Sequence, residues 1–289
     1  MDACDLLTNP ATAGLVARVM LMSGSCYAAP AAVATTAATA AVAAAGCNAA
    51  ADLAACLRGK PALELAAATS ALPPASFSPS IDGHVLAQSP LATLRAGGQV
   101  HAPMIIGTTR DELLAFVDGL SPVPLVGDAG YRAAVEALFG AAAHTILELY
   151  PLAGFRSPRH ALAAALSDEY VICPARRTAR AIAAHDPVWR YELGYAAPAG
   201  PLAAFEASQG LDLMLAFGNF KGVAMSPVEA ALSAEAMAAI GAFADTGEPG
   251  LADWPRMTAA DEYLVWKPGH DRGTNLHGAA CDKWDLVAN

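Results

Sequence analysis

The sequence predicts an α/β fold with a mostly parallel sheet, and three observations support this prediction. Short apolar stretches typical of strands alternate with longer helical stretches along the chain. Met104-Ile105-Ile106 is a continuous apolar run that ends at Gly107, as expected for a parallel strand covered on both faces. Residues 110–185 read as nearly all helical between two strands. Such alternation is typical of α/β proteins.

The first hundred residues are predicted to be mainly helical. Leu15–Met22 combines the end of a helix with a strand that runs into Ser-Gly-Ser. Leu72–Gly83 is rich in Pro and Ser and is expected to be a loop. Helices are predicted over Val33–Ala45, Ala49–Leu57, Ala62–Ala68 and Leu91–Ala96.

The rest of the chain continues the alternation of strands and helices. Ala102–Thr108 is the buried strand, and the acids after it suit the positive end of a helix over Asp111–Val117. Further helices are predicted over Tyr131–Phe139, Ala142–Leu149, Pro158–Tyr170, Pro174–His185 and Pro227–Asp245. Further strands are predicted over Val188–Leu193 and, as the last one, Tyr263–Trp266.

Composition and charge exclude several classes of function. At 289 residues and 55% apolar content, the chain can form one large domain or two smaller ones. The net charge of −10 and the lack of a basic run argue against binding to nucleic acid or anionic membranes. Ala28–Ala45 is uncharged but alanine-rich, so we interpret it as a helix and expect no membrane span. The first residues, with Asp2 and Asp5, do not read as a signal peptide.

Metal and cofactor sites leave characteristic spacings that this chain lacks. The six cysteines include no Cys-x-x-Cys pair and no paired Cys/His spacing typical of zinc. Trp254, Trp266 and Trp284 have no interleaved basic residues, so we interpret them as packing residues. We therefore expect neither a metal nor a cofactor.

One segment carries a motif with a changed residue. Residues 205–220 contain Gln209-Gly210-Leu211-Asp212-Leu213, followed by Phe-Gly-Asn at 217–219. This resembles the histidine segment of the type-B carboxylesterases, the cholinesterase-like α/β-hydrolases, which usually reads His-Gly-x-Glu/Asp-Leu before Phe-Gly-Asn. Gln209 stands where that family has its catalytic histidine. A carboxamide cannot accept a proton from a serine hydroxyl near neutral pH, whereas imidazole can.

Other blocks resemble the same family in the same order. They are residues 5–25, 46–58, 77–83, 103–112, 168–191 and 243–255. The resemblance implies a partial α/β-hydrolase fold in which residues 1–289 form one domain. It also implies that residues 110–187 are a helical insertion that helps to wall the active-site gorge.

The nucleophile of that family is not found in this sequence. The α/β-hydrolase elbow is Gly-x-Ser-x-Gly, and no such pattern occurs between Met1 and Asn289. In the family the elbow lies just before the block that Cys4-Asp5-Leu6-Leu7 resembles, and the oxyanion loop lies earlier still. We therefore expect the chain to correspond to roughly the C-terminal half of a longer esterase.

The resemblance assigns one further site residue. Glu112 occupies the position of the triad acid, which orients the histidine. The alternative for Glu112, and equally for Asp111, is an acid that stabilises a helix start. Ser23 and Ser25 follow a strand as a nucleophile could, but their segment resembles one that turns the chain beside the site.

A neighbouring histidine could in principle replace the missing base in space. None of the seven lies within 205–212, and we interpret each as a surface or hydrogen-bonded residue. They are His84, His101, His144, His160, His185, His270 and His277.

The cysteines give an indication of the cellular compartment of the protein. Cys47 and Cys56 resemble the small disulfide loop of the family, whose closure would contribute about 2–3 kcal/mol. A disulfide implies an oxidising compartment, hence a periplasmic or secreted protein. The alternative is free thiols in a cytosolic protein.

The expected function follows from the resemblance and from the site residues. The family hydrolyses carboxylic esters through an acyl-serine intermediate, so the implied partner is a small-molecule ester. Because the serine is absent and Gln209 replaces the histidine, we expect this chain to be catalytically impaired. One alternative is a non-catalytic, esterase-like binding module. Another is a fragment without a function of its own, which exposes a strand edge.

Overall fold

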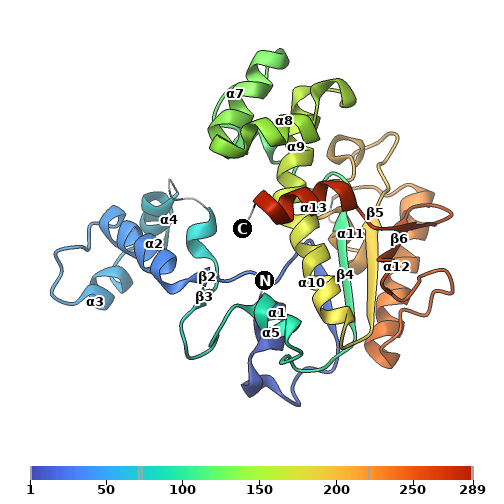
Figure 1. Cartoon of the computed structure of the whole chain (residues 1–289), viewed down its shortest axis with the longest axis horizontal. Helices are drawn as coiled ribbons and strands as arrows, with labels where there is room; N and C mark the ends of the chain where they lie inside the picture. The colour runs from blue at the N-terminus through green and yellow to red at the C-terminus, as the bar shows by residue number, and fades with distance from the viewer. Residues whose placement is uncertain (1, 71, 73, 221, 288–289) are drawn as a thin grey trace. The chain divides into compact units, whose positions relative to one another are not determined.

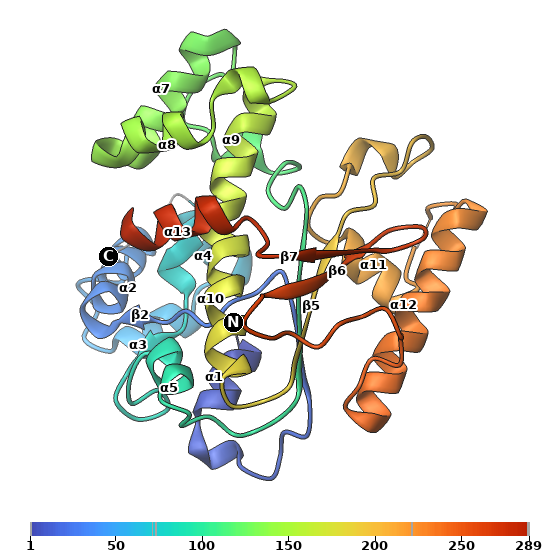
Figure 2. The same ribbon diagram turned by 45° about the vertical axis from the view of Figure 1, so that its right-hand side comes forward.

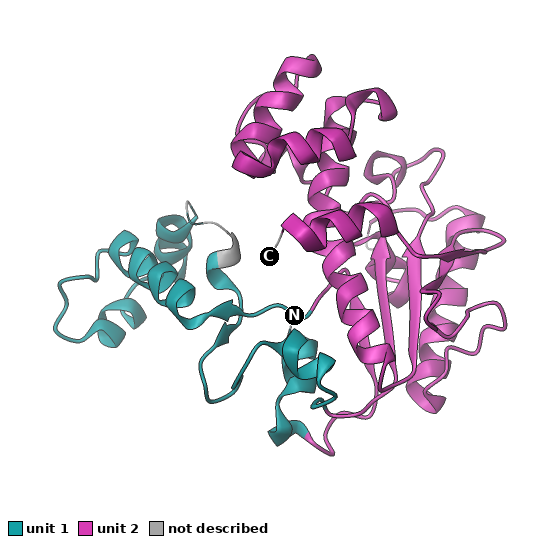
Figure 3. Ribbon diagram, viewed as in Figure 1, with its two compact units in different colours: residues 1–12, 26–99 teal, residues 13–25, 100–289 magenta. Residues whose placement is uncertain are grey.

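The computed structural model describes residues 2–70, 72, 74–220 and 222–287. These residues form two compact units, shown in Figure 3. Unit 1 comprises residues 1–12 and 26–99, and unit 2 comprises residues 13–25 and 100–289. The assignment of residues 1–289 to one domain, with residues 110–187 as a helical insertion, stays a prediction.

Unit 1 is mainly helical and holds two disulfides, Cys4–Cys26 and Cys47–Cys56. The segment predicted as loop over 72–83 contains a helical turn and the strand β3 (Ser80–Ile81), which pairs in parallel with β2 (Ala29–Pro30). Its helices are α1 (Asp2–Thr8), η1 (Pro10–Thr12), α2 (Ala31–Ala44), α3 (Leu53–Arg58), α4 (Ala62–Thr69), η2 (Pro74–Phe77) and α5 (Pro90–Arg95).

Two helices of unit 1 show how the local sequence sets their bounds. None of the residues of α2 is buried, so the high helix propensity of alanine is its main local support. α3 was predicted to begin at Ala49 but begins at Leu53. The reason is Asp52, whose side chain accepts a hydrogen bond from the Ala55 amide at 2.9 Å and caps the helix.

The sheet of unit 2 confirms the predicted α/β class. Its strands lie in the order β1-β4-β5-β6-β7, with β1 at one edge. The first four are parallel to one another, and β7 is antiparallel to β6. The strands are β1 (Val19–Met22), β4 (Met104–Thr109), β5 (Val188–Leu193), β6 (Glu262–Trp266) and β7 (Asp271–Thr274).

Helices cover both faces of this sheet. Figures 1 and 2 show α10 on one face and α11 and α12 on the other. The helices of unit 2 are α6 (Val117–Leu120), α7 (Gly127–Phe139), η3 (Gly140–Ala142), α8 (Ala143–Leu149), η4 (Leu152–Gly154), α9 (Pro158–Ser167), η5 (Asp168–Ile172), α10 (Cys173–Ala183), η6 (Ala203–Phe205), α11 (Leu211–Phe217), α12 (Pro227–Thr246) and α13 (Gly278–Val287).

Two apolar clusters form the core of unit 2. One joins the sheet to α11 and α12, and its largest members include Tyr191, Trp254 and Trp266. The other joins α7, α8, α9 and α13, and contains Leu162 and Trp284. The three tryptophans that the sequence analysis interpreted as packing residues are therefore buried in these clusters.

Three predictions about the elements of unit 2 were wrong. Residues 110–116 form turns, and the helix expected from Asp111 begins only at Val117. The helices predicted on either side of residues 171–173 are continuous, because a π-helical turn, η5, joins α9 to α10. Pro174 lies in the first turn of α10 and lacks an N–H group, which the wider π turn accommodates. β6 is not the last strand, because β7 follows it.

One helix in the described part of the chain, α12, is long and apolar enough to cross a membrane. Leu232, Ala236, Ala239 and Phe243 of this helix are buried in the core against the sheet. The core helix of a globular domain meets the same criteria of length and composition, so α12 is weak evidence for a membrane span.

Candidate active site

Glu112 lies in the turn that follows β4. The chain reverses after Thr109, and the Glu112 side chain folds back so that Oε1 accepts a hydrogen bond from the Thr109 amide at 2.7 Å. The amide of Leu113 donates to Ser167 Oγ at 3.0 Å and ties the turn to the end of α9. Glu112 is fully buried. The acid is thus fixed at the carboxyl end of a central strand by backbone contacts of its own turn.

Ser23 supplies a second hydrogen bond to the same oxygen. It follows β1, the neighbour of β4, and its backbone has the uncommon φ of 48°. Its amide donates to the Gly107 carbonyl at 2.9 Å, and its Oγ donates to Glu112 Oε1 at 2.8 Å. The Ser23 hydroxyl therefore points its proton at a carboxylate rather than at a basic nitrogen. Ser25, two residues later, is buried.

The environment of Glu112 favours its neutral form. Burial raises the pKa of Glu112 to about 7, and the nearby negative charge of Asp212 acts in the same direction. Hydrogen bonds from Thr109 and Ser23 oppose this rise. Both bonds end on Oε1, whereas Oε2 is buried and has no partner among the described residues. A carboxylate oxygen of this kind is available to hold one further donor, such as an imidazole N–H.

Gln209 lies beside Glu112. The Gln209 amide donates to the backbone carbonyl of Glu112 at 3.1 Å, and the Asp111 amide donates to the Ala207 carbonyl at 3.0 Å. Asp111 Oδ2 also accepts from the Ala207 amide at 3.3 Å. The two segments that the sequence analysis chose, 111–112 and 207–209, are thus brought together. The Gln209 side chain itself is exposed to solvent.

A second buried carboxylate, Asp212, adjoins this site. Tyr191 donates its hydroxyl to Asp212 Oδ2 at 2.8 Å, and burial raises the pKa of both groups. The Tyr191 ring lies directly over Gly107, where a Cβ atom would come within 1.9 Å of it. Gly107 is therefore required for the ring to occupy this position. The sequence analysis matched Asp212 to the motif but gave neither it nor Tyr191 a role, because a hydrogen bond between β5 and α11 is not visible in one sequence.

The histidines do not replace the missing base at Glu112. Within the described part of the chain, neither oxygen of Glu112 has a histidine partner. Five of the seven pair with carboxylates elsewhere, as the interpretation of hydrogen-bonded or surface histidines anticipated. The pairs are His101–Asp186, His144–Glu148, His160–Glu206, His270–Glu235 and His277–Asp168.

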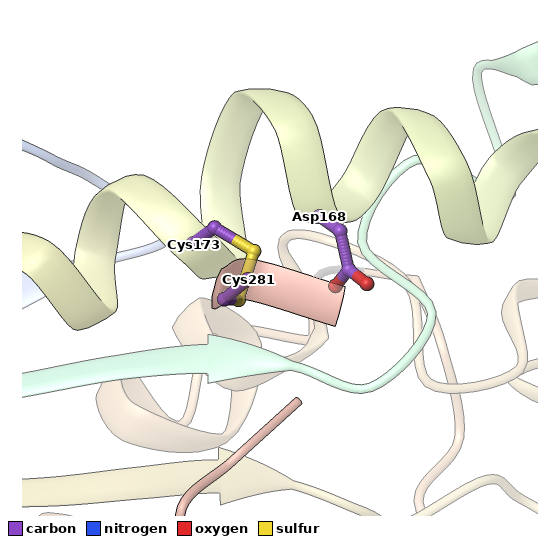
Figure 4. Close-up of side chains that lie close together, drawn as sticks. All are labelled: Asp168, Cys173 and Cys281. Atoms are coloured by element: carbon purple, nitrogen blue, oxygen red, sulfur yellow. A yellow bond between two sulfur atoms is a disulfide. The ribbon is translucent and has the colours of Figure 1, made fainter. Parts of the chain in front are cut away.

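One group of potential metal-binding side chains is explained by a disulfide. Asp168, Cys173 and Cys281 lie close together and are buried. Figure 4 shows that the two sulfur atoms are bonded to each other, so they are not free to act as thiolate ligands. The Asp168 carboxylate instead accepts hydrogen bonds from Tyr150 at 2.6 Å and pairs with His277.

Comparisons with known proteins place this arrangement in a family. The carboxylesterase family model matches residues 2–284. A solved structure of PNB esterase superimposes with a TM-score of 0.76 at 24% identity, covering 97% of this chain and 60% of that one. That likeness shows the fold.

Three curated relatives share sequence with parts of the chain. The Crystal protein of Dictyostelium discoideum is 34% identical over 139 residues, 47% of this chain and 25% of the relative. Para-nitrobenzyl esterase of Bacillus subtilis (strain 168) is 30% identical over 188 residues, 62% of this chain and 37% of the relative. Lipase 2 of Diutina rugosa is 38% identical over 97 residues, 31% of this chain and 17% of the relative. The chain thus spans well under half the length of these relatives. Because the family model covers almost its whole length, the chain belongs to the carboxylesterase family.

Proposed function

We propose that this chain carries the acid and part of the pocket of a carboxylic ester hydrolase, and that its own triad site does not catalyse ester hydrolysis. The contact between the Gln209 amide and the Glu112 carbonyl supports this proposal most directly. It holds position 209 beside a buried carboxylate that has one unpartnered oxygen. An imidazole there could be oriented by Glu112, whereas a carboxamide supplies no base.

Ester hydrolysis by an acyl-serine route needs two further parts. A serine must attack the carbonyl, and backbone amides must hold the oxyanion. The sequence contains no Gly-x-Ser-x-Gly, and the Ser23 hydroxyl donates a hydrogen bond to Glu112. We propose that these parts belong to a longer esterase chain, in line with the limited share of each relative that this chain spans. The substrate class would be a small-molecule carboxylic ester.

The three disulfides support a proposal for the cellular location of this protein. All six cysteines are paired in the structure, as Cys4–Cys26, Cys47–Cys56 and Cys173–Cys281. Such pairing persists in oxidising compartments. We therefore propose a periplasmic or secreted protein.

A second candidate function is a non-catalytic, esterase-like binding module. The exposed side chain of Gln209 favours it, because an amide both donates and accepts hydrogen bonds but does not titrate. Saturation-transfer NMR with short-chain alkyl esters would favour this candidate if the esters bind and are recovered unchanged.

The proposal is tested by assaying the protein with p-nitrophenyl acetate and butyrate, beside Glu112→Gln and Glu112→Ala. We expect Glu112 substitutions to leave the rate unchanged, because the site lacks a base to be oriented. Glu112→Gln keeps the shape of the buried side chain and controls for misfolding of Glu112→Ala. Turnover above an albumin control that falls in Glu112→Gln would contradict the proposal.

A further inference from the structure

A second set of serine, histidine and glutamate lies in unit 2 and uses neither Glu112 nor Gln209. Ser157 immediately precedes α9, His160 is in its first turn, and Glu206 follows η6. Ser157 Oγ lies 2.7 Å from His160 Nδ1, and His160 Nε2 lies 3.2 Å from Glu206 Oε1. A hydroxyl bonded to a base that is oriented by a third group is the arrangement of an activated nucleophile.

The carboxylate fixes which nitrogen of His160 is the base. Glu206 Oε1 can only accept when ionised, so it favours the tautomer with the proton on Nε2. Nδ1 then carries a lone pair that faces the Ser157 hydroxyl. The ring is about four-fifths buried, which limits competition from water for both contacts.

Helix capping does not account for the Ser157 hydroxyl. The chain offers a direct comparison, because Ser157-Pro158 and Ser226-Pro227 both begin helices. Ser226 Oγ accepts from the Glu229 amide at 3.3 Å, and Glu229 reaches back to the Ser226 amide in a capping box. Ser157 makes no such bond to the helix, and its hydroxyl meets the His160 ring instead.

Glu206 is held in an unusual conformation beside the histidine. Its φ of 49° lies in the region that glycine favours, and strain of this kind gathers at functional sites. Arg156 donates to Glu206 Oε2 from the other side. Although burial acts to raise the pKa of Glu206, the hydrogen bonds from Arg156 and His160 hold it below its ordinary value. The carboxylate is thus ionised and positioned for the His160 ring.

His160 and Glu206 line the wall of a cavity of about 440 Å³, within the range of small-molecule sites, and Ser157 follows the lining residue Arg156. The lining combines apolar side chains, among them Leu114 and Phe155, with charged ones, among them Arg110 and Asp111. Arg110 is already engaged by Asp111 and by the Gly194 carbonyl. The apolar side chains offer a surface against which a short acyl chain can pack.

We propose that Ser157 is a nucleophile toward small, activated carboxylic esters, with His160 as its base and Glu206 as the group that orients His160. Ser157 Oγ bonds to the ester carbonyl carbon as its proton passes to His160 Nδ1. The bond from that carbon to the alcohol oxygen breaks, and His160 returns the proton to the leaving alcohol. Water then hydrolyses the acyl-serine with the same base. N–H groups of the first turn of α9, which lack intrahelical acceptors, lie in sequence next to the attacking oxygen.

This proposal goes beyond the function proposed above, and it is tested on the full chain with a fluorophosphonate probe. The adduct is mapped by peptide mass spectrometry, and the labelling rate is compared among variants. We expect the wild-type protein to be labelled at Ser157 and Ser157→Ala to lose that adduct. His160→Gln and Glu206→Gln should slow labelling, the former on the order of 100-fold, as for the loss of a general base.

A matched variant separates this reactivity from helix capping. Ser226→Ala removes a true cap serine and should leave labelling unchanged. Circular dichroism checks that each variant is folded. The wild-type map decides the matter even if a variant unfolds, because the folded protein either carries the probe at Ser157 or does not. Labelling absent from Ser157, or equally fast in a folded His160→Gln, overturns the proposal.

Discussion

The backbone amide of Gln209 donates a hydrogen bond to the backbone carbonyl of Glu112, with an N···O distance of 3.1 Å. Together with the bond from the Asp111 amide to the Ala207 carbonyl, it fixes the register between the two loops. Neither bond involves the side chain at position 209. The loop geometry therefore does not depend on which residue occupies that position.

Gln209→His should accordingly produce an imidazole held by Glu112. We expect its N–H to donate to the unpartnered Oε2 and the carboxylate to stabilise the charged ring, so that the pKa of the introduced imidazole exceeds its ordinary value of about 6.5. Titration by ¹H–¹⁵N NMR of the imidazole measures this value. Adding Glu112→Gln should return it toward 6.5. A single variant that titrates like an exposed histidine would show that the two side chains do not meet.

Glu112 should make the protein less stable as the pH rises. Its folded pKa of about 7 lies above the ordinary value of 4.5, so the folded state binds the proton more tightly. The stabilisation is complete below pH 4.5 and is lost as the pH rises through 7, by about 3 kcal/mol in total. Glu112→Gln removes this loss. Urea unfolding should therefore show Glu112→Gln gaining stability relative to wild type between pH 5 and pH 8.

Glu262 provides the control for that measurement. Hydrogen bonds from the Thr258 amide and hydroxyl hold the pKa of Glu262 below its usual range. Its contribution is present above the unfolded pKa and is lost only in more acidic solution. The difference between Glu262→Gln and wild type should stay constant from pH 5.5 to pH 8, whereas a changing difference would point to a general effect of charge.

The parts of the fold that the sequence predicted are those set by local pattern. The apolar run at 104–106 predicted β4, because burial on both faces leaves a continuous apolar signal. The strand at 188–193 was also predicted, although Arg190 and Glu192 interrupt its apolar residues. The turn at 110–116 was missed because Glu112 accepts a hydrogen bond from the amide of Thr109 at the end of β4 rather than from a helix start. The strand β7 was missed because its sequence, Asp-Arg-Gly-Thr, carries little apolar signal at the sheet edge.

The candidate site also contains residues that the sequence could predict and residues that it could not. Glu112 and Gln209 could be chosen by resemblance to a motif, and the structure places them side by side. The contact of His160 with Glu206 joins residues 46 apart, and that of Tyr191 with Asp212 joins residues 21 apart. Such contacts follow from tertiary packing, which no spacing in a single sequence reveals.

Gly107→Ala should destabilise unit 2. The added Cβ would lie 1.9 Å from the Tyr191 ring, which packs edge-on against Trp254 and Trp266 and cannot move freely. Displacing the ring also breaks its bond to Asp212. We expect a loss of about 3 kcal/mol or more, measured by chemical unfolding. Gly119→Ala is the matched control, because nothing lies within 4 Å of its Cβ and α6 gains an alanine. Equal stability of the two variants would contradict this account of Gly107.

Asp261 should be among the residues most costly to replace. It is buried between Arg176 and Arg190, each only 2% exposed, and accepts hydrogen bonds from both. Arg180 adds a third contact at 3.3 Å. Arg176 also pairs with Asp282 at 2.8 Å, so Asp261→Asn would mainly leave the buried Arg190 guanidinium without its counter-charge. We expect the free energy of unfolding to fall by about 3–5 kcal/mol.

The control for Asp261 is a surface pair with a similar contact. Asp128 accepts from Arg132 at 2.6 Å, but both side chains are more than half exposed. Water screens such a pair, so Asp128→Asn should leave the free energy of unfolding almost unchanged. Both variants can be compared by urea unfolding at neutral pH. The two variants could instead lose the same free energy of unfolding. In that case groups other than Asp261 would neutralise the buried arginines, and the central role of Asp261 would be wrong.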